Sequence, residues 1–280
     1  MSAVGRFAVA DRLQLAFVDS GGPGTPVLCL AGLTRNMADF APVAERLGGR
    51  RRIIRLDSRG RGASDWDPDV MNYTVPVEAQ DALALLDHLE IPRAIILGTS
   101  RGGLLAMTIA VIAKDRLAGV LLNDIGPEVD PKGLEAISAY LGRPPSYASY
   151  AEAAAGQAAA LAEMFPTVTP EEWRRAVEAI YVETDAGLEL RYDPGLREAV
   201  LANTPETPPD LWPLFAALEG VPLALLRGAN SNLLSAETAA RMRTARPDML
   251  FAEVPDRGHV PFLTEPESIA LIDRFLDATP

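Results

Sequence analysis

Residues Arg93 to Lys114 read R-A-I-I-L-G-T-S-R-G-G-L-L-A-M-T-I-A-V-I-A-K, and this stretch decides the fold. It begins with a short apolar run typical of a buried strand and ends with a longer apolar run typical of a helix. Between them lies G-x-S-x-G, with Ser100 at its centre. A serine on so sharp a strand-to-helix turn needs small neighbours, because the two backbones crowd there. The N–H groups that open the following helix would stabilise negative charge beside Ser100.

This strand, turn and helix resemble the nucleophile elbow of the α/β-hydrolase superfamily, and the resemblance extends over nearly the whole chain. It implies an α/β fold with a mostly parallel central sheet flanked by helices. It also implies a serine nucleophile, a late histidine base and an acid between them in the sequence. The segment Asp57 to Asp65 is similar to the family's R-G-x-G-x-S loop, which is structural in most relatives. The alternative interpretation is that Ser100 only caps the helix that follows it.

Composition excludes several classes of function. The net charge of −12 argues against nucleic acid and anionic membranes as partners. With two histidines and one cysteine, no clustered set of metal ligands is visible, and we expect neither a metal nor another cofactor. The single cysteine, Cys29, lies in an apolar strand, where an inert core role is typical. The first residues show no signal-peptide pattern, so we expect a cytoplasmic protein.

Residues 128–211 differ from the rest of the chain, because helical patterns dominate and no run typical of a parallel strand appears. The expected helices are Gly133 to Leu141, Tyr150 to Met164 and Glu171 to Glu183, the last preceded by a capping box at Thr169. The resemblance implies that 128–211 is a helical cap inserted into a core formed by 1–127 and 212–280. The alternative is a helical subdomain with no role in binding.

The chain offers two histidines for the role of general base. His88 lies near the C-terminal end of a predicted helix, where a cation is mildly favourable, and is interpreted as structural. His259 follows the last predicted strand in a glycine-containing loop, where the resemblance places the base. It would accept the proton of Ser100 and return it to the leaving group.

The acid is less clear. The family commonly carries it a few residues after a glycine in the loop before the histidine strand, and that spacing leads from Gly228 to Asn232. An asparagine can accept a hydrogen bond from the histidine, but it does not stabilise the imidazolium ion and it permits the wrong tautomer. In an unrelated serine protease the equivalent exchange costs about 10⁴ in turnover. Either the substitution disables the enzyme, or another carboxylate serves, or the protein is a hydrolase relative that binds without efficient turnover.

Asp124 is the best substitute acid, because some family members carry theirs after the strand that ends there. The favoured interpretation nevertheless gives Asp124 a structural task, hydrogen bonding to loop backbone near the cap hinge. It leaves Asn232 in the third position of the triad. The sequence therefore predicts that the Asn232 side chain lies within hydrogen-bond reach of His259, on the side away from Ser100.

The remaining site candidates lie in two turns. In the family that this chain resembles, the oxyanion hole is formed by backbone N–H groups, and the resemblance implies that those of Leu33 and Arg101 take this role. Arg35 and Asn36 follow Leu33 and are candidates for lining a substrate pocket. The Arg101 side chain could face a substrate carboxylate, but pairing with an acid of the protein is the favoured interpretation.

These residues predict a serine hydrolase that cleaves a carboxylic ester, a lactone or a related carbonyl compound through an acyl-enzyme. A small-molecule substrate is expected, and the oligomeric state stays open. Serine at the elbow argues against the aspartate chemistry of haloalkane dehalogenases and epoxide hydrolases in this superfamily. Two alternatives remain: hydrolysis of a carbon–carbon bond by the same residue types, and a ligand-binding protein on an inactivated hydrolase scaffold.

Overall fold

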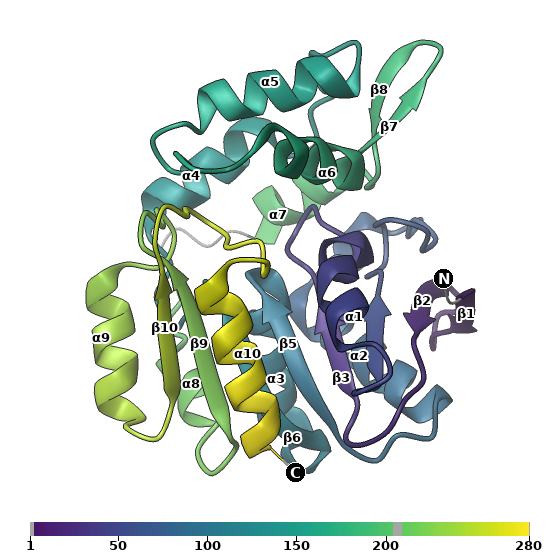
Figure 1. The fold of residues 1–280 in the computed structure, drawn as a ribbon. Helices are drawn as coiled ribbons and strands as arrows, with labels where there is room; N and C mark the ends of the chain where they lie inside the picture. The colour runs from purple at the N-terminus through teal and green to yellow at the C-terminus, as the bar shows by residue number, and fades with distance from the viewer. Residues whose placement is uncertain (1–2, 204–208, 280) are drawn as a thin grey trace.

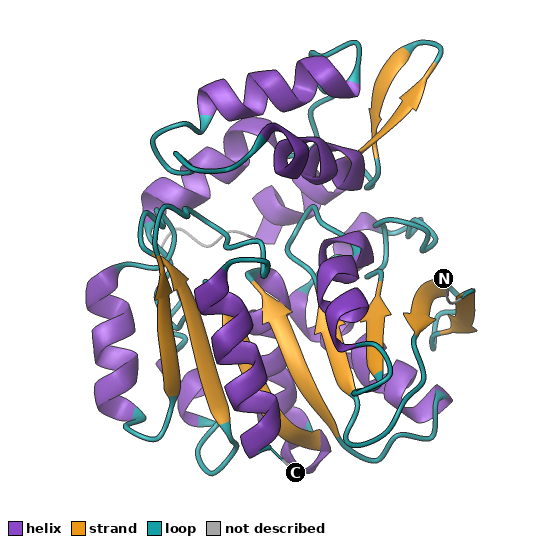
Figure 2. Ribbon diagram, in the orientation of Figure 1, coloured by secondary structure: helices purple, strands orange, loops and turns teal. Residues whose placement is uncertain are grey.

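A computed structural model describes residues 3–203 and 209–279, and within these residues a single large sheet of eight strands forms the centre of the protein (Figures 1 and 2). The strands lie in the order β1-β2-β4-β3-β5-β6-β9-β10. Strand β2 is antiparallel to both of its neighbours, and every other pair is parallel, so the predicted mostly parallel sheet is confirmed. The strand bounds are β1 Val4–Ala8, β2 Gln14–Asp19, β3 Val27–Leu30, β4 Ile53–Leu56, β5 Ala94–Thr99, β6 Leu117–Asn123, β9 Leu223–Gly228 and β10 Leu250–Val254.

Helices cover both faces of this sheet (Figure 1). Alternate residues of the central strands point to opposite faces, so that Ile96 packs with one apolar cluster and Leu97 with the other. The first cluster includes side chains of α2 (Val75–His88), α3 (Arg101–Ile112), α8 (Trp212–Ala216) and α9 (Ala236–Ala245). The second includes side chains of α1 (Ala41–Leu47) and α10 (Pro266–Ala278), together with Phe40 of the short helix η1 (Met37–Phe40). Two further single turns are η2 (Val70–Asn72) and η3 (Lys114–Arg116).

The described part of the segment between β6 and α8 lies beyond the carboxyl ends of the parallel strands (Figure 1). It contains α4 (Pro131–Tyr140), α5 (Tyr150–Ala160), α6 (Pro170–Ile180) and α7 (Leu196–Asn203). The predicted capping box is present at the start of α6: the Thr169 side chain accepts from the Glu172 N–H, and the Glu172 side chain accepts from the Thr169 N–H. Among the described residues, none of the helices combines the length and the apolar character needed to cross a bilayer.

Two predicted helices in this segment were partly wrong, and the first, expected over Tyr150 to Met164, ends at Ala160. The helix expected over Glu171 to Glu183 ends at Ile180, and the chain continues as strand β7 (Tyr181–Thr184), paired antiparallel with β8 (Gly187–Leu190). Tyr181, Val182 and Thr184 are residue types that favour a strand, and Gly187, which has a positive φ of 116°, begins β8. The helical spacing of apolar residues in α6 made the following strand residues hard to distinguish from a continuing helix.

The parallel strands bring together segments that are distant in the sequence. Strands β5 and β6 are neighbours, and β9 and β10 follow on the same side of the sheet. The residues that follow these four strands therefore meet at one edge, where open α/β sheets place their ligand sites.

Candidate active site

The turn after β5 presents Ser100 in a strained conformation. Its φ of 50° and ψ of −116° lie outside the regions that most residues adopt. The turn is tight, because a Cβ atom built on Gly98 would lie 2.5 Å from the carbonyl oxygen of Gly102, and one on Gly102 would lie 2.0 Å from that of Leu30. Ser100 is the N-cap residue of α3, but its side chain makes no capping hydrogen bond. The interpretation of Ser100 as only a helix cap is therefore wrong.

His259 lies in the loop between β10 and α10, with its ring between two polar partners. Its Nε2 is 2.9 Å from the hydroxyl oxygen of Ser100, and its Nδ1 is 2.7 Å from Oδ2 of Asp124. A carboxylate only accepts hydrogen bonds, so it favours a proton on Nδ1 and leaves Nε2 free to accept from Ser100. His88 lies elsewhere, at the end of α2, with its ring stacked against Phe7.

The prediction that Asn232 holds the third position is wrong, because Asp124 occupies the Nδ1 side of His259. Asp124 follows β6, the strand next to the one that delivers Ser100, and is fully buried. It also accepts from the Gly228 N–H and, at 2.6 Å, from the hydroxyl of Ser231. Asp124 thus has a backbone contact alongside the contact with His259, but this contact is with the last residue of β9 rather than with a loop near the cap hinge. The backbone carbonyl of Asn232 instead lies against Gly133 in the first turn of α4.

Further polar groups, which the sequence did not single out, fix the histidine loop. The Asn123 side chain donates to Thr99 Oγ1 and to the Pro261 carbonyl, so it joins the residue before Ser100 to the loop that carries His259. Arg257 donates to Glu265, which also accepts from the N–H of Phe262. Asparagine and arginine are ordinary residues in such positions, and no sequence motif marks them.

The turn after β3 lies beside Ser100. A Cβ atom built on Gly32 would lie 3.6 Å from Cβ of Ser100, which places the peptide between Gly32 and Leu33 next to the serine. Arg101 opens α3, and the first N–H groups of a helix have no acceptor in their own helix. The Arg101 side chain pairs with Glu78, as the favoured interpretation predicted. The oxyanion role of the two N–H groups stays a prediction.

Arg35 and Asn36 are engaged with the protein. Arg35 forms an ion pair with Asp39 and donates to a carbonyl near the C-terminal end of α6, that of Ala176. The Asn36 side chain donates to the carbonyl of Ala179 in the same helix and accepts from the Ala38 N–H. Both therefore attach the turn after β3 to α6, and their contact with a substrate stays a prediction.

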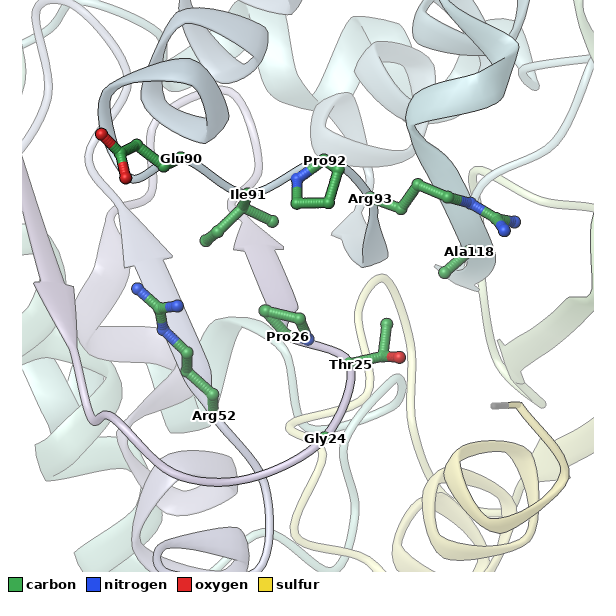
Figure 3. A pocket seen from close by; sticks show the side chains of 9 residues that line it. All are labelled: Gly24, Thr25, Pro26, Arg52, Glu90, Ile91, Pro92, Arg93 and Ala118. Carbon is green, nitrogen blue, oxygen red and sulfur yellow. The ribbon is translucent and has the colours of Figure 1, made fainter.

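A surface hollow of about 600 Å³ lies at the opposite end of the sheet (Figure 3). Its lining comes from the segments that precede the parallel strands and from Ala118 near the start of β6, whereas Ser100 and Asp124 follow their strands. Arg52 at its rim is paired with Asp19. The lining residues are Gly24, Thr25, Pro26, Arg52, Glu90, Ile91, Pro92, Arg93 and Ala118, and none belongs to the Ser100–His259–Asp124 group. Within residues 3–203 and 209–279, no group of three or more His, Cys, Asp or Glu side chains has an arrangement that could hold a metal ion.

The chain is similar to known hydrolases over nearly its whole length. The chain is 38% identical over 272 residues to a 3-hydroxybutyrate-oligomer hydrolase from Cupriavidus necator, covering 94% of this chain and 92% of that protein. It is 30% identical over 259 residues to a 2-(acetamidomethylene)succinate hydrolase from Mesorhizobium japonicum, covering 92% and 90%.

Among solved structures, an alpha/beta hydrolase from Novosphingobium aromaticivorans superposes with a TM-score of 0.92 at 40% identity, covering 99% of this chain and 98% of that one. The model of the alpha/beta hydrolase family matches residues 27–270. These residues include every strand of the parallel part of the sheet, together with Ser100, Asp124 and His259. The chain is thus an enzyme of the hydrolase class and belongs to the alpha/beta hydrolase family.

Proposed function

We propose that this enzyme is a serine hydrolase that cleaves carboxylic esters through an acyl-enzyme. The observation that carries the proposal is the unbroken chain of hydrogen bonds from Ser100 through His259 to Asp124. It combines a nucleophile with a base within reach and a buried carboxylate that orients the base. The reason to suspect an inactivated scaffold was an asparagine in the acid position, and Asp124 removes that reason.

The reaction would follow from the positions of these atoms. Ser100 Oγ attacks the ester carbonyl while His259 Nε2 takes the hydroxyl proton. The resulting oxyanion would accept from the backbone N–H groups of Leu33 and Arg101. Protonated His259 then donates its proton to the leaving alcohol, and Ser100 is left acylated. Water gives a proton to His259 and attacks the acyl carbon. As the bond from the acyl carbon to Ser100 Oγ breaks, His259 returns that proton to Oγ, which releases the carboxylic acid and restores the Ser100 hydroxyl.

Residues 128–211 are proposed to act as a cap over this site. The described part of this segment lies beyond the carboxyl ends of the strands (Figure 1), and two of its side chains contact the loop that carries His259. Phe165 stacks on Phe262 of the histidine loop, and Thr167 accepts from Arg257. A cover of this kind excludes water and shapes the space that a substrate can occupy.

The substrate class that we propose is a short oligoester of a 3-hydroxy acid. The support is the relative that acts on 3-hydroxybutyrate oligomers, since its similarity extends over nearly the full length of both chains. The test is to incubate the enzyme with the dimer and trimer of 3-hydroxybutyrate and to follow the release of monomer by mass spectrometry. The Ser100→Ala variant is the control.

Wild-type protein should release monomer, and a fluorophosphonate probe should label it on Ser100. Labelling together with hydrolysis of other esters, but no release of monomer, would retain the serine mechanism and reject the substrate class. Wild-type protein that neither reacts with the probe nor hydrolyses any ester would refute the serine mechanism.

A further inference from the structure

A buried carboxylate, Glu78 of α2, lies between two arginines, one from the loop after β4 and one from the start of α3. Its Oε2 accepts from Arg101 Nε at 3.0 Å, and its Oε1 accepts from Arg101 Nη2 at 2.7 Å and from Arg61 Nη1 at 3.0 Å. The side chains of Glu78 and Arg61 are each 1% exposed, and that of Arg101 is 13% exposed. The reaction proposed above uses none of these side chains.

This network reaches both segments that flank the proposed oxyanion hole. Arg61 Nε donates to the carbonyl of Leu33 at 2.9 Å, and its Nη1 also donates to the carbonyl of Arg59, so its guanidinium is held from two sides. On the other side, Arg101 is the residue directly after Ser100. One carboxylate therefore connects the turn after β3 to the turn after β5, which are otherwise separate in the sequence.

The charges of these three side chains do not balance. It contains two guanidinium groups and one carboxylate, and arginine stays protonated in proteins. Burial alone would raise the pKa of Glu78, but Arg101 and Arg61 outweigh it and hold that pKa below its ordinary value. Glu78 is thus ionised at neutral pH, and the three groups by themselves sum to +1 in a buried region beside Ser100. The neighbouring Arg59, whose carbonyl accepts from Arg61, is paired with three carboxylates of its own.

We propose that Glu78 and Arg61 are positioning residues for the oxyanion hole. They fix the spacing between the N–H groups of Leu33 and Arg101, and the net positive charge of the network favours the anionic tetrahedral intermediate. This inference rests on the proposed serine mechanism.

The proposal predicts an effect on turnover rather than on substrate binding. The ester carbonyl is neutral in the ground state and becomes an anion only as Ser100 attacks. Correct spacing and positive charge therefore stabilise the transition state more than the bound substrate. A group whose role is only to hold the fold would not separate kcat from KM in this way.

The test compares two arginine-to-lysine variants of the same loop. Arg61→Lys keeps a cation for Glu78 but loses the bond to the Leu33 carbonyl. Arg59→Lys is the matched control, because Arg59 is equally buried but its side chain pairs with Asp81, Asp67 and Asp11 and touches neither Glu78 nor Leu33. Each variant is measured for kcat and KM on p-nitrophenyl butyrate, and for inhibition by an alkyl boronic acid, which forms a tetrahedral anion on the serine.

Arg61→Lys should lower kcat and weaken boronic acid binding by the same factor, roughly 10-fold to 100-fold, with KM nearly unchanged. Arg59→Lys should lower the thermal midpoint and leave both kinetic quantities close to those of the wild type. Equal losses in the two variants, or a loss confined to KM, would overturn the proposal.

If Arg61→Lys does not fold, Arg101→Leu supplies the second test, because it leaves a neutral Arg61–Glu78 pair and the backbone N–H of residue 101. It should lower kcat and boronic acid binding together by at least about fivefold. Unchanged values in a folded Arg101→Leu variant would overturn the proposal while the serine mechanism stands. Wild-type protein without esterase activity or probe labelling would overturn both.

Discussion

Replacing Asp124 by asparagine tests the assignment of the acid most directly. The side chain of Asp124 accepts three hydrogen bonds: Oδ1 accepts from the Gly228 N–H, and Oδ2 accepts from Ser231 and from His259. In the Asp124→Asn variant one of these oxygens becomes an NH₂ group. The variant must therefore place a donor against either Gly228 or His259.

The cost of each orientation decides which one forms. An NH₂ group facing Gly228 would leave a buried backbone N–H unpaired, which costs about 1–3 kcal/mol. An NH₂ group facing His259 avoids that cost, but it draws the ring proton to Nε2, where it blocks acceptance of the Ser100 proton. The second orientation also removes the charge that stabilises the imidazolium ion. We therefore expect a loss of about 10⁴ in kcat, equivalent to about 5.4 kcal/mol of transition-state stabilisation.

The assay is the steady-state hydrolysis of p-nitrophenyl butyrate, with thermal unfolding as a check on the fold. Asn232→Asp is the matched control, because it makes the reverse exchange at the position that the sequence favoured. Its kcat should stay within about threefold of the wild type, since residue 232 is not the partner of His259. The reasoning is refuted if Asp124→Asn keeps more than about a tenth of the wild-type kcat, or if Asn232→Asp raises kcat more than about tenfold.

Two further predictions concern stability and reactivity. Gly62 has a φ of +58°, and a Cβ atom there would lie 2.1 Å from Asp57 Oδ2. Gly62→Ala should therefore lower the free energy of unfolding by roughly 2–4 kcal/mol in urea titrations, whereas Gly49→Ala, with a φ of +78° but nothing within 4 Å, should lose only about 1–2 kcal/mol. Equal losses would show that the Asp57 contact has no cost. Burial raises the pKa of the Cys29 thiol from 9.0 to about 12, so iodoacetamide at pH 8 should label unfolded but not native protein. Rapid labelling of the native protein would contradict the burial of this thiol. Because the thiol of the unfolded chain ionises at a lower pH than that of the native protein, Cys29 stabilises the native state fully below pH 9, and this stabilisation is lost as the pH rises toward 12.

Local patterns in the sequence were sufficient for most of the fold and for two members of the site. The buried strands are continuous apolar runs, and the G-x-S-x-G turn between a strand and a helix placed Ser100. With His88 in a helix, only His259 remained as the base. Local patterns were less sufficient at the end of α6, because residues 181–183 of strand β7 were predicted as part of that helix.

The acid required the tertiary structure. From the sequence alone, Asn232 and Asp124 both lie in loops that follow parallel strands, and spacing favoured the asparagine. The choice depends on which loop reaches the far side of the His259 ring. Strand β6 is adjacent to β5, so the residue directly after β6 lies within 2.7 Å of His259 Nδ1.

The same holds for the network around Glu78. Residues 33, 61, 78 and 101 are spread over four elements, and no spacing rule connects them. Their contacts arise because the turn after β3, the loop after β4, the helix α2 and the elbow after β5 meet at one edge of the sheet. The sequence by itself therefore determined which residue types were available and which elements carry them. Tertiary structure decided which of these residues pair, because hydrogen bonds and ion pairs depend on a distance of about 3 Å in space and not on separation along the chain.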